Sequence, residues 1–125
     1  MDSDIESIAG VWRCTSAIND GKPIGEETTK QLRLTVTREG GYKTELGNQA
    51  LFDSTCAIDP ASTPKQIDMI GTEGENTGRA AQGIYALDGG ALTICYTMPG
   101  NQRPTDFQSE PGSATTLVAW KRAEP

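Results

Sequence analysis

The chain has 125 residues, 35% of them hydrophobic and 22% charged, and its 17 acidic residues outnumber its 11 Lys and Arg for a net charge of −6. A protein that binds nucleic acid or an anionic membrane needs a cationic face, so this balance argues against both partners and favours solubility. The length is that of one domain, and residues 1–125 are therefore predicted to form a single unit.

Targeting and membrane segments are not expected from the sequence. No apolar run approaches the roughly 20 residues that are needed to cross a bilayer. Residues 1–6 are acidic, whereas a signal peptide begins basic and continues apolar. We therefore expect a cytoplasmic chain, unless a native leader has been removed.

Short apolar runs separated by glycine and proline predict strands and turns in the first part of the chain. The run 10–18 ends at Asp20-Gly21, a pair that is typical of a turn. A short helical turn is expected near residues 25–31, where two glutamates come early and favour a helix start. Residues 32–38 then alternate apolar and polar side chains, as a half-buried strand does.

The second part repeats this pattern of short strands and turns. Asp88-Gly89-Gly90 is a strong hairpin signal between two of the predicted strands. Residues 98–104 contain two prolines, which bar a central strand there. The strands predicted in this part are 42–46, 50–58, 66–70, 79–87, 91–97 and 115–121.

About eight strands with short connections are expected to pair antiparallel with their neighbours in sequence. Such a meander closes into an up-and-down barrel, which leaves no exposed sheet edge. The predicted fold class is therefore an all-β, up-and-down barrel of about eight antiparallel strands. The side chains expected to point inward are Trp12, Cys14, Leu32, Leu34, Val36, Cys56, Ile67, Met69, Tyr85, Leu87, Leu92, Ile94 and Leu117.

The three cysteines, Cys14, Cys56 and Cys95, each lie in an apolar, strand-like run. We expect them to be reduced and buried, because a free cysteine packs as a small hydrophobe; a disulfide between two of them is the alternative. The chain has no histidine, which removes Ser-His-Asp and Cys-His catalysis and leaves no convincing set of zinc ligands. No catalytic residue, metal site or cofactor is predicted.

Trp12 is one of only two tryptophans and stands near the start of the first strand. A barrel that is open at one end would expose its core to water. We therefore expect the Trp12 indole to close that end, with a cation stacked on the ring. The alternative is that Trp12 contacts a ligand.

The tripeptide GVW near the start and the pair KR near the end resemble the signature of the lipocalins and of the wider calycin superfamily. This resemblance implies that a basic residue of the last strand lies across the tryptophan ring, with Gly10, Trp12, Lys121 and Arg122 closing the barrel. The segments NDGKPI, LRLTV, TPKQID, GIYALDGGALTICY, RPTDF and WKR resemble an uncharacterised bacterial lipocalin-like domain of planctomycete type. The resemblance covers residues 8–122 and implies a fold, with no activity attached.

Two roles are open for Arg103, which stands in a loop that Pro104 helps to fix. Its guanidinium could recognise an anionic group of a ligand, with Phe107 turned inward beside it. Alternatively, Arg103 pairs with Asp68 or Asp106 and pins the loop to the barrel.

Two tyrosines are further candidates for ligand binding. Tyr85 and Tyr96 could offer hydroxyl groups to a ligand at the mouth of the barrel. The alternative for both is core packing with a hydrated hydroxyl.

Three functions fit these features. The first is a non-enzymatic binder of a small apolar or amphipathic molecule inside the barrel. The alternative is a protein-interaction or structural module with a filled barrel, whose contacts lie on loops such as 71–78 or 98–111. The third is a barrel isomerase or cyclase that works with Tyr, Asp or Arg. An eight-stranded barrel suits either of the first two, because its interior is just wide enough to be filled or to hold one small ligand.

Overall fold

The computed structural model describes residues 7–59, 61–62, 64–71, 78–98 and 101–123. Within these residues, nine strands form one antiparallel sheet. The strands are β1 (Gly10–Asn19), β2 (Lys22–Pro23), β3 (Leu32–Val36), β4 (Gly41–Leu46), β5 (Gln49–Asp59), β6 (Lys65–Gly71), β7 (Ala80–Asp88), β8 (Ala91–Thr97) and β9 (Thr115–Arg122).

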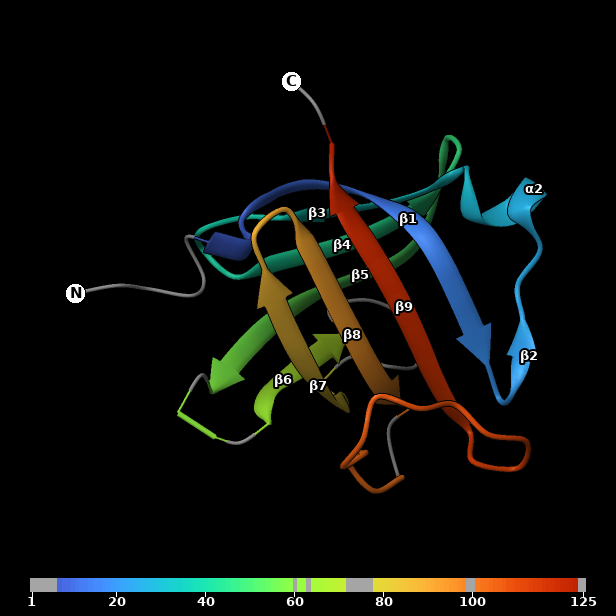
Figure 1. Ribbon diagram of the computed structural model, residues 1–125. Helices are drawn as coiled ribbons and strands as arrows, with labels where there is room; N and C mark the ends of the chain where they lie inside the picture. The colour runs from blue at the N-terminus through green and yellow to red at the C-terminus, as the bar shows by residue number, and fades with distance from the viewer. Residues whose placement is uncertain (1–6, 60, 63, 72–77, 99–100, 124–125) are drawn as a thin grey trace.

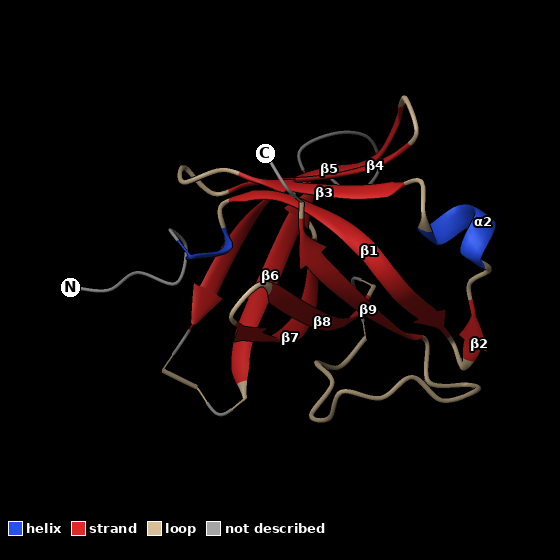
Figure 2. Cartoon of the chain, turned by 45° about the horizontal axis from the view of Figure 1, so that its top comes forward, coloured by secondary structure: helices blue, strands red, loops and turns tan. Residues whose placement is uncertain are grey.

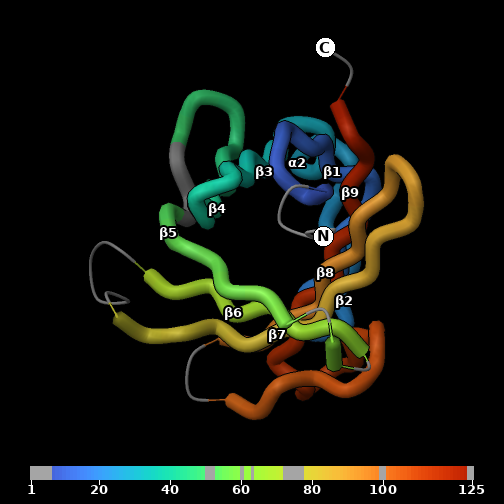
Figure 3. Tube along the Cα trace, turned by 90° about the vertical axis from the view of Figure 1, so that its left-hand side faces the viewer, coloured from blue at the N-terminus to red at the C-terminus, as the bar shows by residue number. Residues whose placement is uncertain are grey.

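The sheet closes on itself because β1 pairs with β9, and these two strands lie side by side in Figure 1. The wall of the barrel has eight strands, since β2 only extends the edge of β1 beyond β3. Figure 3 shows the wall strands arranged as a ring around a common centre. The predicted all-β antiparallel barrel of about eight strands is confirmed.

The expected helical turn is also present. Helix α2 (Glu26–Thr29) follows β2 and lies beside β1 and β3 at the edge of the barrel (Figure 2). Its first turn carries two glutamates, which suit the positive end of a helix dipole. No helix in the described residues is long and apolar enough to span a membrane.

Strand β1 has a bulge between Cys14 and Ser16, where its register with β9 shifts. A bulge inserts one residue and so changes which side chains face inward. Cys14 and Ala17 are therefore both buried, while Thr15 and Ser16 between them are exposed. The bulge places a small alanine on the inner wall.

The interior is lined by alternate residues of each strand, as a pleated wall requires. One expected position was wrong: Val118 and Trp120 of β9 belong to the buried core, and Leu117 does not. Leu117 pairs with Cys95 on the outer face, so the inward set of β9 is shifted by one residue. The buried core cluster consists of Ile8, Trp12, Cys14, Ala17, Leu34, Val36, Tyr42, Ile67, Met69, Ala81, Tyr85, Leu92, Ile94, Val118 and Trp120.

Trp12 fills the end of the barrel where β1 begins and β9 ends. Its side chain is fully buried, and its Nε1 donates a hydrogen bond to the carbonyl oxygen of Ile8 at 2.9 Å. The Arg122 guanidinium lies over the indole, 4.2 Å from the ring centroid, and donates to the carbonyl oxygens of Ala9 and Ser7. The guanidinium thus joins the ring to the backbone of the N-terminal segment.

Two neighbours of this pair have different roles. Gly10 has a φ of +132°, which residues with a side chain rarely adopt, and a Cβ there would lie 2.7 Å from Nη1 of Arg122. The glycine therefore makes room for the guanidinium. Lys121 is exposed and lies opposite Arg13 of β1, so among the described cations it is Arg122 that stacks on Trp12.

All three cysteines are free. Cys14 lies in the buried core as expected, whereas Cys56 is only half-buried and packs against that core. Cys95 lies on the outer face of the wall, opposite Ile84 of β7 and Leu117 of β9, yet it is fully buried. The connection between β8 and β9 covers it, because the Cys95 thiol donates to the carbonyl oxygens of Asp106 and Gln108 in that connection.

Candidate functional site

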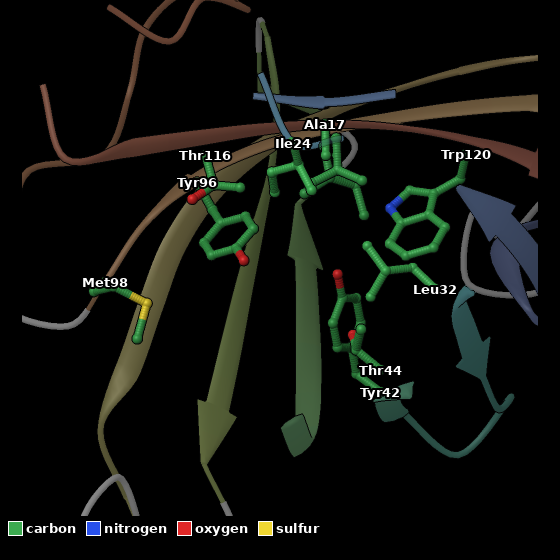
Figure 4. A pocket seen from close by; sticks show the side chains of 11 residues that line it. Ala17, Ile24, Leu32, Tyr42, Thr44, Tyr96, Met98, Thr116 and Trp120 are labelled. Atoms are coloured by element: carbon green, nitrogen blue, oxygen red, sulfur yellow. The ribbon is translucent and has the colours of Figure 1, made fainter. Parts of the chain in front are cut away.

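The barrel contains an apolar cavity of about 260 Å³, whose lining side chains are shown in Figure 4. The core around Trp12 fills one end, whereas the cavity reaches the end where β1 and β8 finish and β9 begins. Met98, which lines it, is 45% exposed and marks the opening to solvent. The lining residues are Ala17, Ile24, Leu32, Tyr42, Thr44, Ile94, Tyr96, Met98, Thr116, Val118 and Trp120.

Local features of the chain leave this space open. The bulge in β1 brings Ala17 rather than a larger side chain to the inner wall, opposite Val118 of β9. The segment that carries β2 and α2 folds back over the end of β1, where the Ile24 amide donates to the Ala17 carbonyl at 2.8 Å. Ile24 is thereby held as one lip of the cavity.

Three polar groups reach the same space from different strands. Figure 4 shows the hydroxyl groups of Tyr42 and Tyr96 and the indole nitrogen of Trp120 directed toward it. Burial raises the pKa of the Tyr42 hydroxyl well above its ordinary value, and nearby Tyr96 and Cys56 add to the rise. Burial likewise raises the pKa of Tyr96, partly offset by a hydrogen bond with the Thr116 side chain. Both phenols are therefore neutral at physiological pH.

None of the described lining residues carries a formal charge. An ion brought into such a site would lose its hydration without gaining a counter-charge, which is costly. In the part of the chain that the structure describes, no group of three Cys, Asp or Glu side chains comes together to hold a metal. The chemistry of this cavity is thus that of an uncharged binding site.

Of the four residues predicted to bind a ligand, only Tyr96 lines the cavity. Tyr85 is 1% exposed and packs within the core, with Lys65 Nζ 6.0 Å from its ring centroid. Phe107 is half-buried in the connection between β8 and β9 and is not among the lining residues. That connection covers the outer wall, which separates Phe107 from the interior.

Arg103 also lies on the outer wall. Its Nη2 is 2.8 Å from Oδ1 of Asp68, and its Nη1 donates to the carbonyl oxygens of Gly83 at 2.9 Å and Ile67 at 3.3 Å. These contacts correspond to the structural role considered for Arg103, with Asp68 as its partner. The guanidinium ties the connection to β6 and β7 and does not reach the cavity.

Replacing Arg103 by alanine should therefore loosen the connection without closing the cavity. Hydrogen bonds to a charged group each contribute roughly 1.5–3 kcal/mol to the free energy of unfolding. The contribution is smaller in this protein, because the Arg103–Asp68 ion pair is partly exposed and solvent screens it. We expect faster amide hydrogen exchange in residues 101–114, measured by mass spectrometry, with unchanged exchange in β3 and β4. Equal protection of the connection in Arg103→Ala and the native chain would contradict this anchoring role.

Tyr42 and Trp120 were not identified as site residues from the sequence. A signal for Trp120 was available, since neighbouring residues in a strand face opposite sides. If Arg122 stacks on the buried Trp12, then Arg122 faces inward. Trp120 and Val118, which alternate with it along the same strand, must face inward as well. No comparable signal marks Tyr42, because its strand position does not say whether space lies in front of its hydroxyl.

A row of cations crosses the outer wall beside the closed end. Arg13 of β1 lies directly opposite Arg33 of β3 on one side and Lys121 of β9 on the other, and all three side chains are exposed. Among the described residues, no ion pair joins a member of this row to an acid. Like charges that face each other across strands destabilise a sheet.

Arg13→Thr should consequently stabilise the barrel by about 0.2–1 kcal/mol at low salt. The gain should shrink as ionic strength rises, because salt screens exposed charges. Urea unfolding at two salt concentrations measures both effects. The control is Arg38→Thr, which removes an exposed cation from the turn after β3. Because the chain is net negative, loss of a cation there should give no gain, and a similar gain would show that the effect does not come from the row of cations.

No protein-family model, curated protein or solved structure matches the chain. The fold and the cavity alone define its class, an eight-stranded antiparallel barrel with an apolar interior site. Most of the 71–78 loop considered as an interaction surface lies outside the described residues.

Proposed function

We propose that the chain is a lipocalin-like binding protein that holds a small apolar or amphipathic molecule in the mouth of its barrel. The observation that carries this proposal is the apolar cavity of about 260 Å³ beside the exposed Met98. Burying apolar ligand surface there contributes roughly 25 cal/mol per Å². The volume lies just below the roughly 300–1,000 Å³ of sites for drug-sized ligands, so the molecule is small.

A filled barrel was the alternative interpretation. It fits the end of the barrel around Trp12, where the indole is fully buried within the core cluster. The cavity between Ala17 and Trp120 favours the binding function over a barrel that serves only as a scaffold.

Binding of 1-aminoanthracene, a neutral fluorescent dye, tests the proposal. We expect a saturable rise in fluorescence with the native chain. Ala17→Leu should weaken binding by about tenfold or more, because a misfit in an apolar pocket costs roughly 1–3 kcal/mol. The added side chain projects into the cavity, which makes this variant a direct probe of the site.

Ala119→Leu is the matched control. Ala119 lies on the adjacent outer face of β9, opposite Ser16, and does not line the cavity. We expect this variant to bind the dye as the native chain does. Equal loss of binding in both variants, or no saturable binding by the native chain, would defeat the proposed function.

A further inference from the structure

Among the residues that the structure describes, the indole nitrogen of Trp120 finds no hydrogen-bond partner, although it is a buried donor. The Trp120 side chain is only 4% exposed and lines the cavity. The other tryptophan differs, since Nε1 of Trp12 donates to the Ile8 carbonyl. Buried indole N–H groups usually have a partner, and one left unpaired costs roughly 1–3 kcal/mol.

The direction of the Trp120 nitrogen explains why none of the described residues accepts a hydrogen bond from it. Figure 4 shows the nitrogen turned toward the interior space that Leu32, Ala17 and the two tyrosine hydroxyls surround. An acceptor placed in that space would complete the hydrogen bond. The unpaired donor is therefore part of the binding surface.

The chemistry of the donor restricts what can occupy the space. An indole N–H donates and never accepts, so it recognises an oxygen or nitrogen with a lone pair. The lining residues that the structure describes carry no positive charge to balance a carboxylate, so an anionic acceptor is disfavoured. The remaining partner is a neutral acceptor on an otherwise apolar molecule.

We infer that the cavity selects a small, neutral molecule with one hydrogen-bond acceptor, such as a ketone, whose acceptor atom bonds to Nε1 of Trp120. This inference rests on the proposed function and adds to it the class of ligand and the residue that recognises it. The apolar part of the molecule packs against Ile24, Leu32 and Ile94. Trp120 then acts as the specificity-determining residue of the site.

Displacement of 1-aminoanthracene by three matched molecules tests the inference on the full chain. The probes are 2-nonanone, nonane and nonanoate, which share chain length and differ in the acceptor. We expect 2-nonanone to bind about 3- to 10-fold more tightly than nonane, the value of one neutral hydrogen bond, and nonanoate to bind most weakly. In Trp120→Phe the preference for the ketone over the alkane should disappear.

A spectroscopic measurement on the native chain avoids dependence on the folding of that variant. The chain has two tryptophans, so its ¹H–¹⁵N spectrum has two indole signals. Saturation with 2-nonanone should move the Trp120 signal downfield and leave that of Trp12 unchanged, because Trp12 already donates to Ile8. Tyr96→Phe keeps the indole in place and should preserve this shift.

The outcomes separate the two proposals. Equal affinity for ketone and alkane, tightest binding of nonanoate, or a Trp120 signal that does not move would overturn the inference while dye binding still supports the proposed function. Failure of the native chain to bind the dye and all three probes would defeat the proposed function itself.

Discussion

Trp12→Ala is expected to destabilise the barrel by about 3–5 kcal/mol, the cost typical of truncating a large aromatic side chain in a core. The indole is fully buried and closes the end of the barrel, so its removal leaves a cavity and exposes the core beside it. The Arg122 guanidinium also loses the ring on which it is stacked. Since domains of this kind have total stabilities of about 5–15 kcal/mol, the loss should be a large part of the whole.

Urea unfolding followed by circular dichroism measures this effect. Val11→Ala is the control, because Val11 is the neighbouring residue and is 40% exposed; it should change the free energy of unfolding by less than about 0.5 kcal/mol. Trp12→Phe retains an aromatic ring and should fall between the two. A similar midpoint for Trp12→Ala and Val11→Ala would show that the indole does not close the barrel.

Gly83→Ala should cost about 1–3 kcal/mol through overpacking. Gly83 lies in the middle of β7, opposite Tyr96 of β8. A Cβ at this position would lie 2.7 Å from the Cys95 carbonyl oxygen and 2.8 Å from Cβ of Tyr96. Either the backbone of β8 or the tyrosine must move to admit the methyl group.

The substitution therefore links stability to the cavity, because Tyr96 is one of its walls. We expect both a lower free energy of unfolding and weaker binding of 1-aminoanthracene. Gly90→Ala is the matched control, since a Cβ there meets nothing within 4 Å. If Gly83→Ala keeps native stability and native dye affinity, the close approach of β7 and β8 does not require a glycine at this position.

Much of the architecture was predictable from local patterns. The alternation in 32–38 and the Asp-Gly-Gly turn after residue 87 correspond to β3 and to the hairpin of β7 and β8. These signals succeed because pleating and turn chemistry act over only a few residues. The ring of strands then follows from short connections between neighbours.

The cavity was not predictable in the same way, because it depends on which residues of each strand face the interior at a given height of the barrel. The bulge in β1 shifts these residues by one position and brings Ala17 inward, and no residue type at 14–16 announces it. Leu117 and Val118 are both good core residues, so only the stacking of Arg122 on Trp12 distinguishes their faces. Arg103 was a similar case, since a loop sequence does not say on which side of a wall the loop packs.

The joining of β1 to β9 has a consequence for how the chain folds. Every other strand pairing in the wall joins strands that follow one another in the chain, whereas Arg122 bonds to Ala9 across 113 positions of the sequence. Bringing such distant segments together carries the largest loop-closure entropy in the barrel, so we expect it to be a late and slow step. The cavity is enclosed only after that step. A ligand should therefore lengthen the lifetime of the native state while leaving the refolding rate nearly unchanged.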